Sequence, residues 1–230
     1  MATRAPRRSA QQRRRLILQS AQAVFAASTY AKVGTADLAK AAGISEPALY
    51  RYFPSKKDLF IATIQDSGAR LLEVWERLAM ELVNPLDVIR AIGFGYYDHL
   101  RSRSPMTKLL FQAISEADDP DIRRALHENF AFLIGFIMEN IEEAKRRGLI
   151  RPDVDTIVAA WQFMGMGLCL DLIHMLDFTD EIDRSAVEEW QGMYLGSLLG
   201  TPSLTKPERL LAGVGFGRSM MEDWHGLHLE

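Results

Sequence analysis

The spacing of apolar residues is the feature that most constrains the fold of this 230-residue chain. Apolar side chains recur every three or four residues, as on one face of an α-helix, and strand-like alternation is absent over any useful length. The clearest stripe runs through Ile122, Leu126, Phe130, Leu133, Ile137 and Ile141. The pattern predicts an all-α protein with helices over 10–28, 35–42, 46–52, 56–82, 85–102, 105–116, 119–147, 154–177 and 181–199.

Several of these helices carry markers at their ends. Ser55 is followed three residues later by Asp58, a spacing typical of a capping box. Asp119 places an acid near the positive end of the helix dipole at the start of 119–147. At the other end of that helix, three basic residues precede Gly148, which predicts a stop there.

Charge is divided unevenly along the chain. Residues 1–57 hold 11 Lys or Arg against 2 Asp or Glu, a balance of +9, while residues 58–230 carry −12. A basic head on an acidic body predicts that the head meets a polyanion, with a solvated basic tail as the alternative. The one cysteine, Cys169, excludes an intrachain disulfide and a cysteine-rich metal cluster, so we expect a reducing, cytoplasmic setting.

Neither a membrane segment nor an export signal is expected. The longest nearly apolar run, Ile157 to Leu170, has 14 residues and stops at Asp171, which is too short to span a bilayer. The arginines at 13–15 precede a short apolar stretch like that of a signal, but Gln19 and later polar residues interrupt it. The apolar residues that follow have the spacing of one helical face.

The last two long helices are apolar on more than one side, which indicates burial on more than one side. Interior glycines of 181–199 share one stripe, and each costs a helix about 0.5–1 kcal/mol relative to Ala, which favours close approach of another backbone. A second chain is the simplest source of that backbone, and a central hairpin of a monomer core is the alternative. The predicted homodimer interface comprises Met166, Leu170, Gly192, Gly196 and Leu199.

Residues 35–53 fit a helix-turn-helix. Two helices this short must cross tightly, so Ala39 is small at the crossing, and Gly43 stands at the turn, where a positive φ is needed. Ser45 is placed to N-cap the second helix, and Pro47 lies in its first turn, where a missing N–H costs little. In this motif the second helix enters the major groove of DNA.

The residues around this motif resemble the DNA-binding domain of the TetR family. The resemblance covers about residues 10–61 and rests on Phe25, Leu38-Ala39, Ala42-Gly43-Ile44-Ser45, Leu49-Tyr50-Arg51-Tyr52-Phe53 and Ser55-Lys56-Lys57-Asp58-Leu59-Phe60. It implies a homodimeric one-component transcriptional regulator, a repressor, that binds a palindromic double-stranded DNA operator and is released by a small ligand.

The resemblance also implies DNA contacts. Phosphate contacts, which fix register without reading sequence, fall to Thr35, Tyr50 and Lys56. Residues of the recognition helix that face base edges are Glu46, Pro47, Ala48 and Tyr52, after Ser45 at its start. Aromatic packing is the alternative for both tyrosines. Beyond the resemblance, the basic arm, with Arg7 and Arg8, would reach a minor groove or add salt-sensitive affinity.

Three departures from the family pattern stand out. The first helix ends at 28–30 in Ser-Thr-Tyr rather than Gly-Tyr or Gly-Phe, and Gly34 replaces a common Ser or Thr. Ala36 occupies a position where longer side chains can reach bases. Since Ala36 and Ala48 are both short, we predict that DNA shape and the arm contribute more to recognition than usual.

The helices after residue 56 would surround a regulatory cavity suited to a mostly apolar, unidentified small-molecule effector. Its predicted lining comprises Trp75, Tyr97, Phe111, Phe130, Trp161 and Met164, and ordinary core packing is the alternative for each. Gln112 and Asp171 are among the polar candidates to orient a ligand. A buried hydrogen-bonded pair of Asp171 with His174 is favoured over a shared metal ion, because two ligands make a weak site.

The sequence thus predicts three parts: a DNA-binding domain over 1–55, a regulatory and dimerisation domain over 56–200, and a tail over 201–230. No catalytic or metal-binding motif is found, so neither an enzyme nor a cofactor or metal is expected. The alternative function is a helical interaction protein whose head binds nucleic acid without sequence preference. Steep salt dependence without operator preference would favour that alternative.

Overall fold

A computed structural model describes residues 10–101, 105–180 and 182–200. The basic arm with Arg7 and Arg8, and the tail over 201–230, lie outside the described residues. Within those residues the chain forms helices and no strand, which confirms the all-α prediction. The helices are α1 (Ala10–Ala27), α2 (Thr35–Ala41), α3 (Glu46–Tyr50), α4 (Lys56–Glu81), α5 (Pro85–Arg101), α6 (Met106–Ser115), α7 (Pro120–Arg146), α8 (Thr156–Met175) and α9 (Arg184–Leu199).

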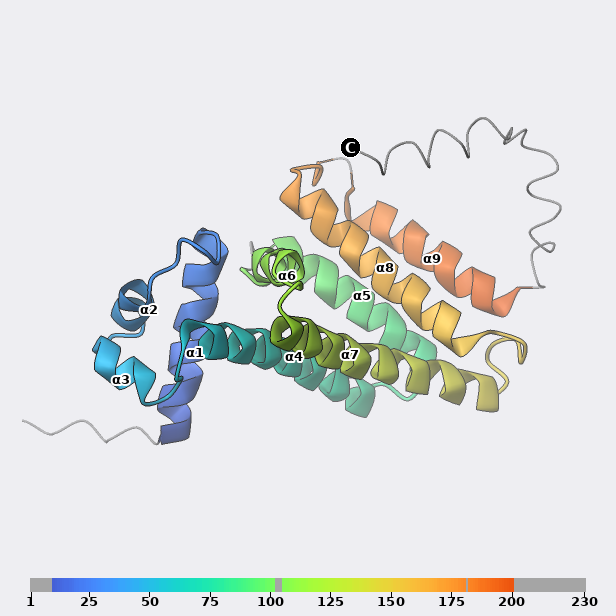
Figure 1. Cartoon of the computed structure of the whole chain (residues 1–230). Helices are drawn as coiled ribbons and strands as arrows, with labels where there is room; N and C mark the ends of the chain where they lie inside the picture. Colours follow the sequence, from blue (N-terminus) through green and yellow to red (C-terminus); the bar gives the residue numbers. More distant parts are fainter. Residues whose placement is uncertain (1–9, 102–104, 181, 201–230) are drawn as a thin grey trace, which may run out of the picture.

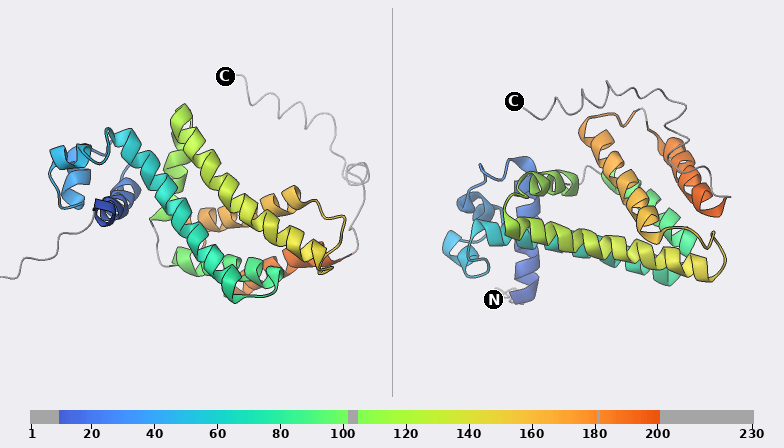
Figure 2. Two further views of the ribbon diagram at one scale, coloured as in Figure 1. Left: turned by 90° about the horizontal axis from the view of Figure 1, so that it is seen from below. Right: turned by 45° about the vertical axis from the view of Figure 1, so that its right-hand side comes forward.

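The first three helices form a small head at one end of an elongated molecule, and the later helices form a larger bundle (Figure 1). α4 leaves the head and runs the length of the bundle, with α7 packed beside it (Figure 2). Both helices begin next to the head, where the ammonium of Lys57 lies 2.9 Å from the carboxylate of Asp121. This salt bridge ties the N-termini of α4 and α7 to each other beside the head.

Local sequence signals set the helix ends where they were predicted. The Ser55 hydroxyl accepts a hydrogen bond from the Asp58 amide, and the Asp119 carboxylate accepts from the first amides of α7. Gly148 follows the end of α7 with a φ of 66°, a conformation that glycine adopts without steric cost. These caps satisfy backbone groups that a helix end leaves without an intrahelical partner.

Two large apolar clusters hold the molecule together. One joins α4, α5, α7, α8 and α9 in the bundle, around residues such as Ile137 and Ala160. The other fills the head with Leu18, Phe25 and Phe60 and continues into α6 and α7. The core of the head thus crosses the proposed domain boundary after residue 55, because helices of both parts contribute side chains to it.

Among the described helices, α8 is long and apolar enough to cross a membrane, judged by length and composition alone. The apolar run stops at Asp171, and the helix continues past it to Met175, within the predicted range of 154–177, with Asp171 buried inside the protein. α8 packs against α5, α6, α7 and α9.

A candidate DNA-binding head and ligand pocket

The head has the geometry of a helix-turn-helix. Leu38 and Ala39 of α2 and Leu49 of α3 are buried together in the core of the head. The turn between the two helices has Gly43 at a φ of 64°, the positive value predicted for it. α3 begins at Glu46 after an extended Ser45, and Pro47 lies in its first turn. Ser45 stands at the N-cap position as predicted, but its side chain makes no capping hydrogen bond.

Three of the predicted DNA contacts come together across the turn. The Thr35 hydroxyl donates a hydrogen bond to the Glu46 carboxylate, and the Tyr50 hydroxyl lies 3.4 Å from the Thr35 oxygen. Tyr50 is 46% exposed, and Pro47 is also exposed, so the outer surface of α3 is open to a partner. Because Glu46 is engaged by Thr35, its carboxylate orients this cluster in the free protein.

Two other predicted contacts have structural partners. The Lys56 ammonium donates to the backbone oxygens of Tyr30, at 2.9 Å, and Val33, at 3.1 Å, and lies over the Tyr30 ring. The Tyr52 side chain is half-buried against the core of the head. A phosphate contact by Lys56 stays a prediction, and it requires this side chain to leave or share its carbonyl partners. Ala48 is half-buried on α3.

The Gln112 side chain lies elsewhere than the sequence predicts. It was predicted to orient a ligand, but its amide nitrogen donates to the backbone oxygens of Phe25, at 2.6 Å, and Ser28, at 2.5 Å. These carbonyls lie at the end of α1, where the usual glycine of the family is missing. A side chain from α6 therefore caps α1. The only sequence signal for this cap is the Ser-Thr-Tyr at 28–30, where the family usually has Gly-Tyr or Gly-Phe.

Salt bridges tie the first turns of α4 and α7. The Lys57 ammonium lies 2.9 Å from Asp121 and 3.2 Å from Asp119. Hydrogen bonds to Asp121 and Asp119 raise the pKa of Lys57, and the hydrogen bond from Lys57 lowers the pKa of Asp121. Arg70 of α4 links the bundle to the head, because its guanidinium donates to the Gln22 side chain of α1 at 2.7 Å.

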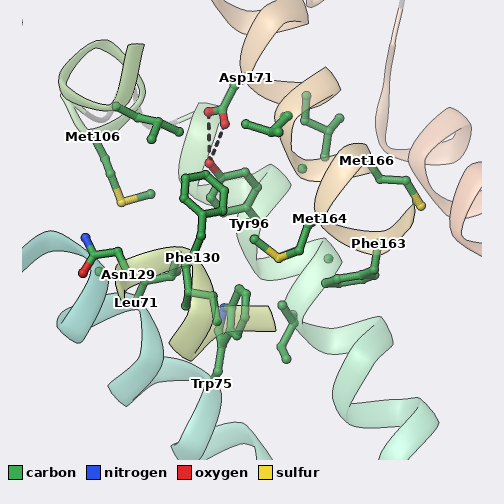
Figure 3. Close-up of a pocket in the computed structure, with 18 of the residues that line it drawn as sticks. Leu71, Trp75, Tyr96, Met106, Asn129, Phe130, Phe163, Met164, Met166 and Asp171 are labelled. Carbon is green, nitrogen blue, oxygen red and sulfur yellow. Dashed lines mark hydrogen bonds between the residues drawn. The ribbon is translucent and has the colours of Figure 1, made fainter. Parts of the chain in front are cut away.

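A pocket of about 120 Å³ lies between the helices of the bundle (Figure 3). Residues from α4, α5, α6, α7, α8 and α9 line it, and nearly all of its wall is apolar. Aromatic and methionine side chains stand around it, as Figure 3 shows for Trp75, Tyr96, Phe130, Phe163 and Met164. A cavity of this size is comparable with one that holds a single aromatic ring.

The polar end of the pocket is built around Asp171, which is 1% exposed. The Tyr96 hydroxyl donates to both carboxylate oxygens, at 2.8 and 3.0 Å, and the Thr107 hydroxyl donates at 2.7 Å. Burial raises the pKa of Asp171, and burial together with the negative charge of Asp171 raises the pKa of Tyr96. The predicted hydrogen-bonded partner was His174, but the hydroxyls of Tyr96 and Thr107 make the bonds.

The pocket includes some of the residues predicted to line it and not others. Trp75, Phe130 and Met164 are part of its wall. Tyr97 faces away from it and packs with Leu100, Leu170 and Val187, while its neighbour Tyr96 lines the pocket. Phe111 is half-buried on α6 outside the wall, and Trp161 is 51% exposed on the outer face of α8.

The predicted interface residues divide in a similar way. Gly192, Gly196 and Leu199 are exposed on α9, and a Cβ added at either glycine would meet open space. Leu170 is 5% exposed inside the protomer, and Met166 is half-buried and lines the pocket. These two residues face inward, because the outward face of α8 is the opposite one, formed by Val158, Trp161, Leu172, Met175 and Leu176.

Comparisons with known proteins agree with this architecture. The family model described as "Bacterial regulatory proteins, tetR family" matches residues 17–63. The nucleoid occlusion factor SlmA of Marinobacter nauticus (strain ATCC 700491 / DSM 11845 / VT8) is 45% identical over 145 residues, which cover 61% of this chain and 72% of that protein. The HTH-type transcriptional regulator EthR of Mycolicibacterium smegmatis (strain ATCC 700084 / mc(2)155) is 41% identical over 92 residues, 40% of this chain and 42% of that protein.

Solved structures share the fold over most of the chain. Salmonella enterica GusR superposes with a TM-score of 0.70 at 22% identity, over 83% of this chain and 97% of that one. The transcriptional regulator FadR from Bacillus subtilis, solved in complex with stearoyl-CoA, superposes with a TM-score of 0.63 at 17% identity, over 81% of this chain and 97% of that one. With its helix-turn-helix head and helical bundle, the chain belongs to the TetR family of DNA-binding transcriptional regulators.

Proposed function

We propose that this protein is a homodimeric, cytoplasmic one-component repressor that binds a palindromic operator and is released by a small, mostly apolar ligand. Residues 1–55 would carry DNA recognition, and residues 56–200 would hold the ligand and the partner subunit. The single observation that carries the proposal is the shared wall between pocket and head. Ile64, Leu109 and Leu126 belong both to the lining of the pocket and to the apolar core of the head.

This shared wall gives ligand binding a physical route to the DNA-binding surface. A ligand that displaces Leu109 or Leu126 also disturbs the core on which α1 rests, because interiors are close-packed and transmit strain. α6 then moves Gln112, which holds the end of α1, and α4 moves Lys57 and Arg70 at its links to α7 and α1. These contacts support a joint shift of α4 and α6.

The outward faces of α8 and α9 support the homodimer. Trp161, Leu172 and Leu199 are 51%, 43% and 56% exposed in the protomer, and Met193 is 69% exposed. Contiguous apolar surface of this kind marks an interaction site. Exposed Gly192 and Gly196 would let a partner helix approach the backbone of α9 closely. Burying these faces against a second copy would place two heads on one duplex.

The spacing between the two heads would then set operator affinity. Recognition helices of a dimer engage successive major grooves when they lie about 34–36 Å apart, or at a suitable multiple of that distance. A ligand that prefers a different spacing weakens DNA binding, and the coupling free energy between such sites is typically about 1–3 kcal/mol. The ligand therefore needs only a modest preference for the displaced state to release the operator.

Selection of bound duplexes from a random-sequence DNA pool, at near-physiological salt and without ligand, tests the DNA-binding part of the proposal. We expect enrichment of a palindrome with half-sites about one helical turn apart. The enriched duplex then serves as the operator for all ligand experiments. Binding without enrichment that disappears as salt rises would instead support a head that binds nucleic acid without sequence preference.

A second candidate role is that of a nucleoid occlusion factor, favoured by the 45% identity to SlmA of Marinobacter nauticus. The two roles differ in what a bound site does in the cell. Deleting a repressor raises transcripts beside the enriched palindrome. Deleting a nucleoid occlusion factor leaves those transcripts unchanged and alters where cells divide relative to the nucleoid.

A further inference from the structure

Among the described residues, the pocket wall carries charge of one sign. Of the 25 described residues that line it, none is Lys, Arg or His, and the one acidic residue is Asp171. A carboxylate or phosphate on a ligand would therefore find no cation in this wall. It would also meet the electrostatic repulsion of Asp171 in a region of low dielectric, where charges interact more strongly than in water.

Several polar side chains of the wall donate hydrogen bonds to the protein itself. The Ser67 hydroxyl donates to the Thr63 backbone oxygen at 2.9 Å, and the Asn129 amide nitrogen donates to the Ile64 oxygen at 2.8 Å. The Tyr96 hydroxyl is directed at Asp171. What this end of the pocket presents to a ligand is consequently a buried acceptor, because two carboxylate oxygens have about four lone-pair sites and three contacts occupy them.

Across the part of the chain that the structure describes, the groups that act on Asp171 include no Lys or Arg. The groups that favour its ionised form are the hydroxyls of Thr107 and Tyr96, followed by His174 on its own helix and His99 on α5. Burial outweighs them, so the pKa of Asp171 is raised, while burial lowers the pKa of His99. An incoming cation would supply the missing partner, since an opposite charge within about 4–6 Å favours an ionised carboxylate.

We propose that the pocket binds a small apolar amine, about one aromatic ring with a short side chain in size, whose protonated nitrogen lies against Asp171, and that it discriminates against carboxylates. This inference rests on the proposed function, because it names the chemical class of the effector for the same pocket. The size follows from the volume of about 120 Å³. The charge follows from the lone carboxylate at one end of an otherwise apolar wall.

Three probes of matched shape test the charge preference: 2-phenylethylamine, 2-phenylethanol and phenylacetate. Their affinities for the full-length protein are measured by isothermal titration calorimetry at pH 7. We expect the amine to bind about 10-fold or more tightly than the alcohol, since an opposite charge moves a nearby carboxylate pKa by about 1–3 units. Phenylacetate should bind more weakly than the alcohol, because its charge has the same sign as that of Asp171.

The variant Asp171→Asn, measured with the same probes, provides a second test. It removes the charge in nearly the same shape, so the amine should lose its advantage over the alcohol while the alcohol still binds. Asp177→Asn is the matched control, because it makes the same charge change just after α8, at an exposed position outside the pocket whose φ of 65° asparagine tolerates. The control should keep the wild-type order of affinities. If Asp171→Asn does not fold, the order of the three probe affinities for the wild-type protein alone tests the amine preference.

The outcomes separate this inference from the proposed function. Phenylacetate that binds as tightly as the amine, or the absence of binding by all three probes, would overturn the amine preference. If the alcohol binds as tightly as the amine and releases the operator equally well, the charge inference is wrong and the ligand-released repressor stands. If the amine binds in the predicted order but leaves operator affinity unchanged, the ligand class holds and the proposed release fails.

Discussion

At the scale of single residues, the role of Gln112 is the least expected, because this side chain of α6 caps the end of α1. Its amide donates to two backbone oxygens that no capping glycine serves. Gln112→Ala should lower the free energy of unfolding by about 1–3 kcal/mol, because it removes two hydrogen bonds to part-buried backbone oxygens, each worth about 0.5–1.5 kcal/mol net. Urea denaturation measures this loss. The control is Ser115→Ala on the exposed side of the same helix, and an equal, small effect of both substitutions would contradict the capping role.

Tyr50 offers a test of phosphate contact on the recognition helix. Tyr50→Phe removes the exposed hydroxyl next to Thr35 and keeps the ring. We expect DNA affinity to fall by about 0.5–1.5 kcal/mol, the net value of one hydrogen bond. The fall should be the same for the operator and for variants with changed bases, since phosphate contacts carry no sequence information. Fluorescence anisotropy measures it, and a loss confined to one base pair would show base readout instead.

The buried Asp171 makes a prediction about pH. Because burial raises its pKa, the folded state holds the proton more tightly than the unfolded state does. The contribution of Asp171 to stability is therefore full below the ordinary Asp pKa of about 3.9 and is lost as pH rises through the raised pKa. The unfolding free energy of the wild type minus that of Asp171→Asn should fall with rising pH over this interval. A difference that does not change with pH would contradict the raised pKa.

At this scale, a residue's role was predictable from the sequence only when its interaction partners lie close to it along the chain. Gly43 and Ser55 were predicted correctly, since their conformations are set by residues one to three positions away. Gln112 was not, because its partners lie 84 and 87 residues earlier in the chain. The partners of Lys56 lie 23 and 26 residues earlier, and no local pattern indicates them. Only the fold brings these groups together.

At the scale of elements, α8 was correctly placed but wrongly oriented. Its predicted range of 154–177 contains the observed Thr156–Met175. Its composition is apolar on every side, so no polar face indicates which side meets the solvent. The interior face with Leu170 and the outer face with Trp161 were therefore interchanged, as the burial of these two residues shows. The amphipathic α7 posed no such difficulty, because its apolar stripe identifies its buried side.

The outer face of α8 predicts the effect of breaking the dimer. Trp161→Asp places a charge in the centre of the proposed interface, where an unpaired buried charge is costly. We expect the variant to be monomeric at micromolar concentration by sedimentation velocity and to bind the operator more weakly. Phe132→Asp is the matched control, since Phe132 is a 65% exposed aromatic residue on α7. Two variants that remain equally dimeric would exclude this face as the interface.

At the scale of the whole molecule, the number and limits of the helices were predictable, but their joint core was not. The periodic pattern located every described helix to within a few residues. It suggested a boundary after residue 55, whereas side chains of α6 and α7 complete the core of the head. Such contacts join segments more than 40 residues apart. For this reason the connection between pocket and head, on which regulation rests, followed only from the structure.

That connection is tested most directly by filling the pocket without any ligand. Leu133→Trp adds an indole ring to the pocket wall, and Ile150→Phe overpacks the same apolar cluster away from the pocket. The measurement is the affinity of each folded, dimeric variant for the selected operator. We expect Leu133→Trp to weaken operator binding by about 5–150-fold, as for a coupling of about 1–3 kcal/mol, and Ile150→Phe to leave it unchanged. Wild-type affinity in the pocket-filled variant would contradict the coupling of pocket and head.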